Sequence, residues 1–175
     1  MTDMIMIDGA EGEGGGQVVR SSLALAIVTQ SPVTITNVRA KRKRPGLLRQ
    51  HLTALRAAAD ICGAQVTGNE LGSSHVTFQP GPVHGGEYHF RIGTAGSTTL
   101  VMQTILLPLL CAEHCSQVTL EGGTHNPLAP PYRLRGNGGG RRGSGDRPSL
   151  DVAEPVPGSC ERLSNRVWVV SATRS

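Results

Sequence analysis

Hydrophobic positions in residues 1–132 recur with two periods, one of two residues and one of three to four residues. The first period is typical of half-buried strands and the second of amphipathic helices. Val33–Val38 alternates with the strand period, whereas Gln17–Thr29 carries its apolar side chains on one helical stripe. The pattern predicts strands at 4–7, 33–38, 65–67, 76–78, 88–92 and 118–120, and helices at 17–29, 45–62 and 99–112.

The expected limits of the second helix come from a proline and a glycine. Pro45 stands where a proline commonly occupies the first helical position, and Gly63 is a typical residue just after a helix end. Between them, Leu52 and Leu55 fall on one face. This helix is therefore expected to begin at Pro45 and to end at Cys62.

The order of these elements is itself repeated once. A glycine loop, a helix, a Val-Thr-Ile or Val-Thr-Leu strand and a polar loop occur twice, with a period of about 80 residues. This predicts an α+β fold of repeated β-α-β-α-β-β units, each with a four-stranded sheet and two helices on one face. We expect a full unit at 1–92 and an incomplete second unit at 93–132, because the pattern stops after Tyr132.

The remaining residues, 133–175, differ in kind. The sixteen residues from Arg133 to Pro148 include six glycines and five arginines and almost nothing apolar, which predicts disorder. Two interpretations stay open: an Arg/Gly-rich tail that binds nucleic acid, or a foreign C-terminus produced by a shifted reading frame. In this tail, Val167–Val170 has the pattern of a short strand.

Composition and charge limit the classes of protein that remain. Hydrophobic residues make up 38% and aromatic residues 3%, so the core must be built mainly from aliphatic side chains. No apolar run reaches the roughly 18 residues of a membrane span, so no membrane partner is expected. The net charge of +4 lies entirely in 133–175, because residues 1–132 hold nine basic and nine acidic residues. The four cysteines show no disulfide framework, which favours a reducing, cytoplasmic setting.

A glycine loop lies between the first expected strand and the first expected helix. In Gly12-Glu-Gly-Gly-Gly-Gln17 the glycines either let backbone N–H groups approach a phosphate or simply form a tight turn. The spacing matches neither a Rossmann fingerprint nor a Walker A loop. Glu13 is unusual there, because a carboxylate beside a phosphate needs a divalent cation between them. Its alternative role is a favourable interaction with the helix dipole.

Positive charge gathers in a second segment of the sequence, after the expected strand at 33–38. Five of the six residues from Arg39 to Arg44 are basic, Arg49 and His51 follow, and Arg20 lies one turn into the first helix. Several cations near two helix N-termini suit a polyphosphate or the phosphorylated end of an RNA. The alternative interpretation is a solvated charged loop.

Three further groups have both a structural and a functional interpretation. Cys111, His114 and Cys115 suggest a metal, but they lack a tetrahedral partner pair, and core cysteines are expected instead. His125 is expected in a turn rather than in a catalytic pair. Gln103 lies in an apolar helix, where its amide needs either a core hydrogen-bond partner or a ligand.

Four segments together resemble the RNA 3′-terminal phosphate cyclase family, in order along about residues 4–132. They are Asp8–Gln17, Arg39 with Arg42–His51, Gly93–Ser97 with Leu100–Gln103, and Gly122–Pro127 with Ala129–Pro131. The resemblance implies a fold of repeated β-α-β-α-β-β units with a small inserted domain. That fold agrees with the internal repeat of this sequence.

The resemblance also implies a ligase-class reaction in which ATP and Mg²⁺ or Mn²⁺ convert an RNA 3′-phosphate into a 2′,3′-cyclic phosphate. In the family a histidine attacks the α-phosphate of ATP and becomes adenylylated. AMP then passes to the RNA 3′-phosphate, and the neighbouring 2′-OH displaces it. By similarity, the ATP-binding residues are Gln103, Glu13, Gly14 and Gly15, with Glu13 near the metal, and the residues that contact phosphate or RNA are Arg20, Arg39, Arg42 and His51.

The chain also departs from the family pattern. Family chains are about twice as long, their nucleophilic histidine lies in the C-terminal part, and nothing after Tyr132 resembles them. We therefore expect an N-terminal fragment that lacks the nucleophile and is inactive alone. Two alternatives stay open: a module that binds ATP or RNA ends without catalysis, and a non-functional gene remnant. An uncovered sheet edge in the second unit also favours self-association.

Overall fold

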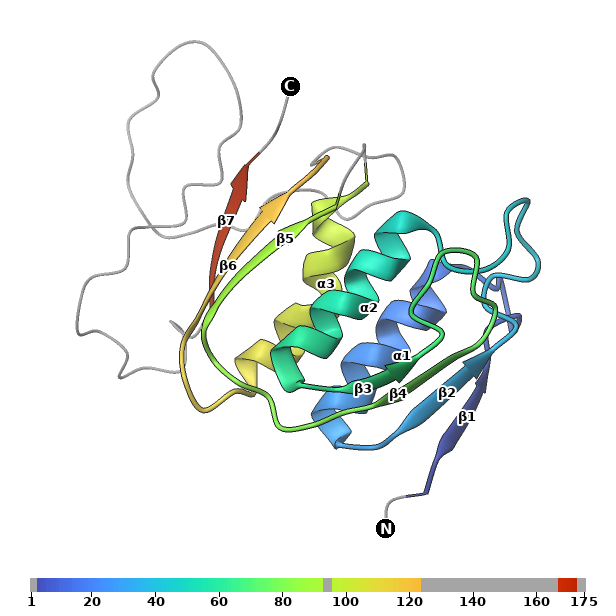
Figure 1. Ribbon diagram of the computed structural model, residues 1–175, viewed down its shortest axis with the longest axis horizontal. Coiled ribbons are helices and arrows are strands. Elements are labelled where there is room, and N and C mark those ends of the chain that lie inside the picture. Colours follow the sequence, from blue (N-terminus) through green and yellow to red (C-terminus); the bar gives the residue numbers. More distant parts are fainter. Residues whose placement is uncertain (1–2, 93–95, 124–166, 173–175) are drawn as a thin grey trace.

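The computed structural model describes residues 3–92, 96–123 and 167–172 (Figure 1). In chain order, the elements are β1 (Ile5–Asp8), α1 (Gly16–Thr29), β2 (Val33–Thr36), α2 (Arg49–Cys62), β3 (Gln65–Thr67), β4 (Val76–Gln79), β5 (Glu87–Arg91), α3 (Thr98–Leu110), β6 (Ser116–Glu121) and β7 (Val167–Ala172).

The structure has two sheets, and each contains a pair of parallel strands joined through a helix. In the first, β1 and β2 are parallel neighbours joined through α1, with Ile5 opposite Val33. In the second, β5 and β6 are parallel neighbours joined through α3, with Tyr88 opposite Val118. The first sheet has the order β1-β2-β4-β3 and the second the order β5-β6-β7. The expected α+β class is confirmed, because the chain combines helices with a four-stranded sheet of parallel and antiparallel strands, in the predicted order of elements.

The strand β5 differs from its expected place. The sequence pattern assigned residues 88–92 to the first unit, but β5 pairs with β6 in the second sheet. Within the first sheet, β4 already has β2 on one side and β3 on the other, both antiparallel to it. The second unit therefore starts before Glu87, at the linker that follows β4.

The strand expected near the C-terminus is present as β7. It pairs in parallel with β6 over six residues, from Ser116 opposite Val167 to Glu121 opposite Ala172. The predicted disorder of the Arg/Gly-rich stretch concerns residues outside the part that the structure describes. In β7, however, this tail supplies one strand to the second sheet.

The three helices lie side by side between the two sheets, and their first turns are at the same end of the helix layer (Figure 1). Aliphatic side chains fill the space between helices and sheets, as the composition predicted. Fully buried residues of this core include Leu23, Ile27, Ile35, Leu55, Ile61, Phe78, Ile105, Leu109 and Leu120. Because the helices share one orientation, their N-terminal ends are brought together.

The second helix begins later than expected, at Arg49 rather than Pro45. Gly46 has a left-handed backbone, with φ of 77°, and its N–H bonds to the carbonyl of Val38. The N–H of Leu47 bonds to the carbonyl of Ser73. These long-range bonds hold the segment as a loop, so Pro45 lies before the helix and not in its first turn.

The cysteines are not all in the core. Cys62 is a buried free thiol, as expected, whereas Cys111 is an exposed free thiol. Cys115 is disulfide-bonded, so the expectation of no disulfide framework is wrong at this position. Among the helices of the described residues, none has the length and apolar character needed to cross a membrane.

Candidate phosphate-binding site

The glycine loop connects β1 to α1 and leaves the first turn of the helix open. Gly12 and Gly14 have φ of 59° and 55°, a region that favours glycine. Gly15 is the N-cap of α1, and no side chain caps the helix there. The first N–H groups of α1 therefore have no side-chain partner within the described residues and remain available to an anion.

His51 packs against the start of this helix. It belongs to the first turn of α2 and is 3% exposed, and a Cβ at Gly16 would overlap its Nε2 atom. The backbone N–H of Leu48 donates to His51 Nδ1 at 3.2 Å. Since Nδ1 accepts this bond, a neutral ring carries its proton on Nε2, which then acts as a donor.

The charge state of His51 follows from its surroundings. Burial, and then the charges of Arg39 and Arg20, lower its pKa to about 4. The imidazole is therefore neutral at neutral pH. The arrangement gives the site a neutral N–H donor close to the α1 N-terminus.

Arg20 is a buried cation at the same place. It is 8% exposed, and a Cβ at Gly16 would lie 3.1 Å from its Nη1. Its Nη2 donates to Oε1 of Gln17 at 2.9 Å, but its buried Nε has no partner among the described residues. Burial lowers the pKa of the Arg20 guanidinium. A buried cation without a carboxylate partner is costly, and an anion bound beside it would offset that cost.

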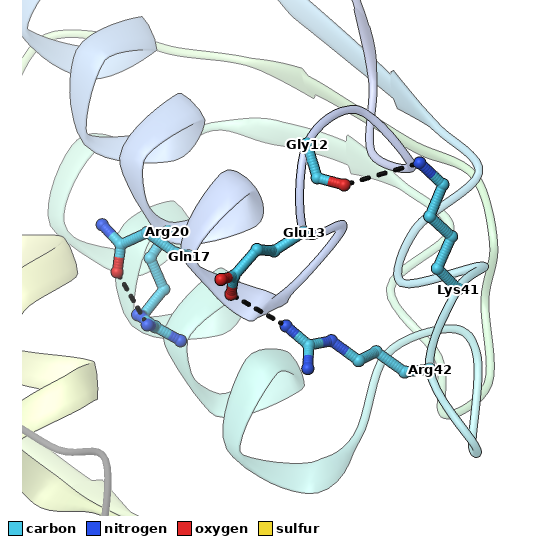
Figure 2. A network of polar contacts seen from close by, with 6 residues as sticks. All are labelled: Gly12, Glu13, Gln17, Arg20, Lys41 and Arg42. Carbon is cyan, nitrogen blue, oxygen red and sulfur yellow. Dashed lines mark hydrogen bonds and ion pairs between the residues drawn. The ribbon is translucent and has the colours of Figure 1, made fainter.

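Arg42 completes the group from the other side of the glycine loop. A Cβ at Gly15 would lie 2.9 Å from its Nη2, and the same nitrogen is 3.5 Å from Oε2 of Glu13. Figure 2 shows Arg42 and Lys41 reaching toward the glycine loop, with the Lys41 ammonium 3.4 Å from the carbonyl of Gly12. Both ion-pair partners are exposed, so this pair contributes little to stability and can exchange for another anion.

We call this group the phosphate cradle: Gly15, Gly16, Arg20, Arg42 and His51. It unites residues from the glycine loop, α1, the loop before α2, and α2 itself. Gly14, next to it in the glycine loop, approaches the loop's own backbone closely: a Cβ there would lie 3.3 Å from Ala10 Cα. Sequence reasoning did not single out Gly16, although the run of three glycines before the helix was a signal for it.

Arg39 was expected to contact phosphate, but its side chain is engaged with the backbone. Its Nη1 donates to the carbonyls of Arg44 and Gly46 at 2.7 and 2.8 Å. The residue is 9% exposed and has φ of 56°. Its charge still acts on His51, whereas its hydrogen bonds close the loop.

Gln103 lies on α3, a different helix from those of the phosphate cradle. Its side chain is exposed, and it forms no hydrogen bond with another described residue. The core hydrogen bond that the sequence left open is therefore not formed. The amide is available to a ligand, which leaves its expected ATP contact as a prediction.

Glu13 is the single acidic residue of the predicted metal site. Its side chain is 96% exposed. Among the described residues, no three His, Cys, Asp or Glu side chains gather to hold a metal ion, and this includes Cys111 with His114. One exposed carboxylate fits Mg²⁺ that shares its coordination with phosphate oxygens, since Mg²⁺ keeps waters and binds few carboxylates. It does not form a complete metal site on its own.

The described residues also line an open cavity of about 560 Å³ at the other end of the helix layer. Its lining includes Val28, Gln30, His84, Cys111 and His114. No residue of the phosphate cradle borders it, and its lining contains no lysine or arginine. This cavity therefore has none of the positive charge that a polyphosphate requires.

These observations can be compared with known protein families. The sequence model of the RNA 3′-terminal phosphate cyclase family matches residues 11–136, well over half of the chain. The chain belongs to the RNA 3′-terminal phosphate cyclase family. The match covers all members of the phosphate cradle and α3 with Gln103. The resemblance seen in the sequence is thus confirmed for this portion of the chain.

Proposed function

We propose that this cyclase-family chain binds the phosphate groups of ATP and of an RNA 3′-terminal phosphate at the phosphate cradle, without completing cyclisation by itself. The observation that carries the proposal is the convergence of buried Arg20, His51 and the open N-terminus of α1 on one point. A phosphate accepts hydrogen bonds from all three and neutralises Arg20.

The role proposed for Glu13 and Arg42 follows from their ion pair. A phosphate entering the cradle competes with the Glu13 carboxylate for Arg42. Mg²⁺ or Mn²⁺ bound to Glu13 would offset the repulsion between this carboxylate and the phosphate. We therefore propose Glu13 as the one carboxylate contact of a divalent ion that arrives with the nucleotide.

The proposed lack of catalysis rests on the histidines. Adenylylation needs an imidazole nitrogen with a free lone pair, in line with the α-phosphorus. His51 is a member of the cradle, but its Nδ1 accepts a hydrogen bond from the Leu48 N–H and its Nε2 carries the proton. His89 pairs with Glu121, and His84 and His114 line the distant cavity. None of these four rings offers a nucleophile to the cradle. Of the other two histidines, His75 is exposed just before β4 and is not a member of the cradle, and His125 lies outside the described residues.

Binding is tested with fluorescently labelled RNA that ends in a 3′-phosphate or in a 3′-hydroxyl. We expect the phosphorylated end to bind about tenfold more tightly, as a charge-assisted contact requires. Arg42→Gln should reduce this preference, because Arg42 is exposed and its removal leaves the core intact. Arg91→Gln on β5 is the matched control and should leave the preference unchanged. Equal affinity for both ends would refute the proposal.

Catalysis is tested separately with ATP labelled in the α-phosphate and Mg²⁺ or Mn²⁺. We expect no acid-labile AMP on the denatured chain, and no cyclic phosphate on the RNA. Covalent AMP would contradict the proposed lack of catalysis, and peptide mapping would then identify the histidine. The binding experiment does not depend on this result.

A further inference from the structure

Positive charge continues beyond the phosphate cradle over an exposed surface. From residue 14 to residue 59 the sequence contains eight lysines and arginines and no aspartate or glutamate. Six of the eight are exposed. Arg56 lies further along α2, and the other five lie before or at the start of α2: Lys41, Arg42, Lys43, Arg44 and Arg49. We call Lys41–Arg44 the basic loop.

The basic loop is held in one shape by the residues around it. Arg39 Nη1 donates to the carbonyls of Arg44 and Gly46, which closes the loop on the inside. Backbone bonds add to this, from Arg42 N to the Arg39 carbonyl and from Gly46 N to the Val38 carbonyl. The loop therefore presents its cations without having to be ordered by a ligand, which lowers the entropic cost of binding.

The charges of this surface are largely uncompensated within the described residues. Arg42 pairs with Glu13, and Lys41 contacts the Gly12 carbonyl. The side chains of Lys43, Arg44 and Arg49 form no ion pair or hydrogen bond with the described part of the chain. A row of unpaired cations that adjoins a phosphate site fits a partner with repeated negative charge.

We propose that the basic loop and Arg49 bind the phosphodiester backbone of a single-stranded RNA whose 3′-terminal phosphate occupies the phosphate cradle. This inference rests on the proposed function, because it extends the same site from the end of the RNA to its preceding nucleotides. Arg42 belongs to both the basic loop and the cradle, and Lys41 contacts Gly12 in the adjoining glycine loop, so the two surfaces are continuous (Figure 2).

The same surface makes recognition independent of base sequence. The residues from 14 to 59 include no Phe, Tyr or Trp, so this surface cannot stack bases on an aromatic ring. Contacts to backbone phosphates position a nucleic acid but do not select its sequence. We therefore expect affinity to rise with RNA length, to fall with salt, and to change little between homopolymers.

The experiment uses the full chain and three ligands that end in a 3′-phosphate: a mononucleotide, and RNAs of roughly 4 and 12 nucleotides. The test variant is Lys43→Gln/Arg44→Gln, and the matched control is Arg56→Gln/Arg91→Gln, which removes the same charge elsewhere. For the longest RNA, the slope of log affinity against log salt should fall by about 1.4 in the test variant, or about 0.7 per lost contact. Affinity for the mononucleotide should stay unchanged in both variants.

Three results would overturn the inference. The first is a wild-type affinity that does not rise with RNA length. The second is an equal loss of RNA affinity in the test and control variants. The third is a test variant that loses as much affinity for the mononucleotide as for the longest RNA. The proposed function fails differently, if a 3′-hydroxyl end binds as well as a 3′-phosphate end at every length. In that case a length-dependent loss confined to the test variant still supports the basic loop. Circular dichroism of both variants confirms that they fold.

Discussion

His51 Nε2 lies directly against the backbone of Gly16, in the space that a side chain at position 16 would occupy. The contact joins the first turn of α2 to the first turn of α1. It is possible only because Gly16 has no Cβ, although its backbone is helical and any residue could adopt it. Glycine is required here for space and not for conformation.

The first prediction concerns this contact. Gly16→Ala should destabilise the fold by about 1–3 kcal/mol, the usual cost of overpacking, although alanine favours helices. His51→Ala alone leaves a gap, but Gly16→Ala should cost little in the His51→Ala background, because the overlap is then gone. Urea denaturation of the single and double variants measures this coupling. Additive effects would mean that the two residues do not compete for the space.

Gly15→Ala is the matched control for that cycle. A Cβ at Gly15 would lie 2.9 Å from Nη2 of Arg42, which is the end of a flexible and exposed side chain. Arg42 can move away, so the stability loss should be much smaller than for Gly16→Ala. A larger loss at Gly15 would show that the loop, rather than the His51 ring, limits substitution.

The second prediction is a pH dependence of stability. The pKa of His51 is lowered to about 4 by burial and by Arg39 and Arg20, whereas the unfolded chain has about 6.5. Between these values the unfolded state binds more protons, so the free energy of unfolding falls as pH decreases from about 6.5 to about 4. The full effect is at most about 3 kcal/mol.

His51→Asn isolates this effect, because its side-chain oxygen can still accept the Leu48 N–H and does not titrate. Urea denaturation between pH 7 and pH 4.5 should show a steeper loss for the wild type than for the variant. The carboxylates are common to both proteins and cancel in the comparison. Parallel curves would mean that His51 titrates normally in the folded chain.

The third prediction concerns Arg39 as the residue that closes the basic loop. Arg39→Met leaves the carbonyls of Arg44 and Gly46 without their donor, which should cost about 1–3 kcal/mol. Trypsin should then cleave within Lys41–Arg44 faster than in the wild type. Arg44→Met, whose side chain is exposed, should change neither stability nor cleavage at Lys41. Unchanged cleavage in Arg39→Met would assign Arg39 no role in loop closure.

The fourth prediction concerns β7, the strand supplied by the tail. It is an edge strand that pairs with β6, with Val118 opposite Val169. Successive N–H groups of a strand point to opposite sides, so only alternate residues of an edge strand donate to its neighbour. Of Val169→Pro and Val170→Pro, one should therefore lower the free energy of unfolding more than the other, by about 1–3 kcal/mol. Thermal unfolding of both variants measures the difference. If neither substitution changes the stability, β7 does not support the fold.

The fifth prediction concerns self-association through the edge of the first sheet, whereas the sequence favoured an edge in the second unit. Met4, just before the edge strand β1, and Ile5 and Met6 within it are exposed by 44%, 47% and 65%. A charge on an edge strand opposes pairing with another chain. Met6→Lys should therefore shift sedimentation toward the monomer, whereas Leu71→Lys, at an exposed apolar site in the connection between β3 and β4, should not. Identical sedimentation of both variants and the wild type would exclude association through β1.

The order and type of the elements were predictable from the sequence because they depend on local periodicity. The helices at 16–29 and 98–110 and the strands of both sheets lie within a few residues of their expected places. The glycine loop and the neighbouring cations were also visible as residue types. These features depend on the spacing of residue types along the chain, so they can be recognised without knowledge of distant contacts.

Tertiary contacts decided the rest. The start of α2 at Arg49 depends on bonds from Gly46 and Leu47 to Val38 and Ser73, and the sheet of β5 depends on which strand it meets. Arg39 donates to backbone carbonyls, whereas Arg42 is exposed and pairs with Glu13. This difference cannot be predicted from two arginines in one charged run. Likewise, the low pKa of His51 and the need for Gly16 arise only when α1 and α2 pack together, because burial and close approach are properties of neighbours in space.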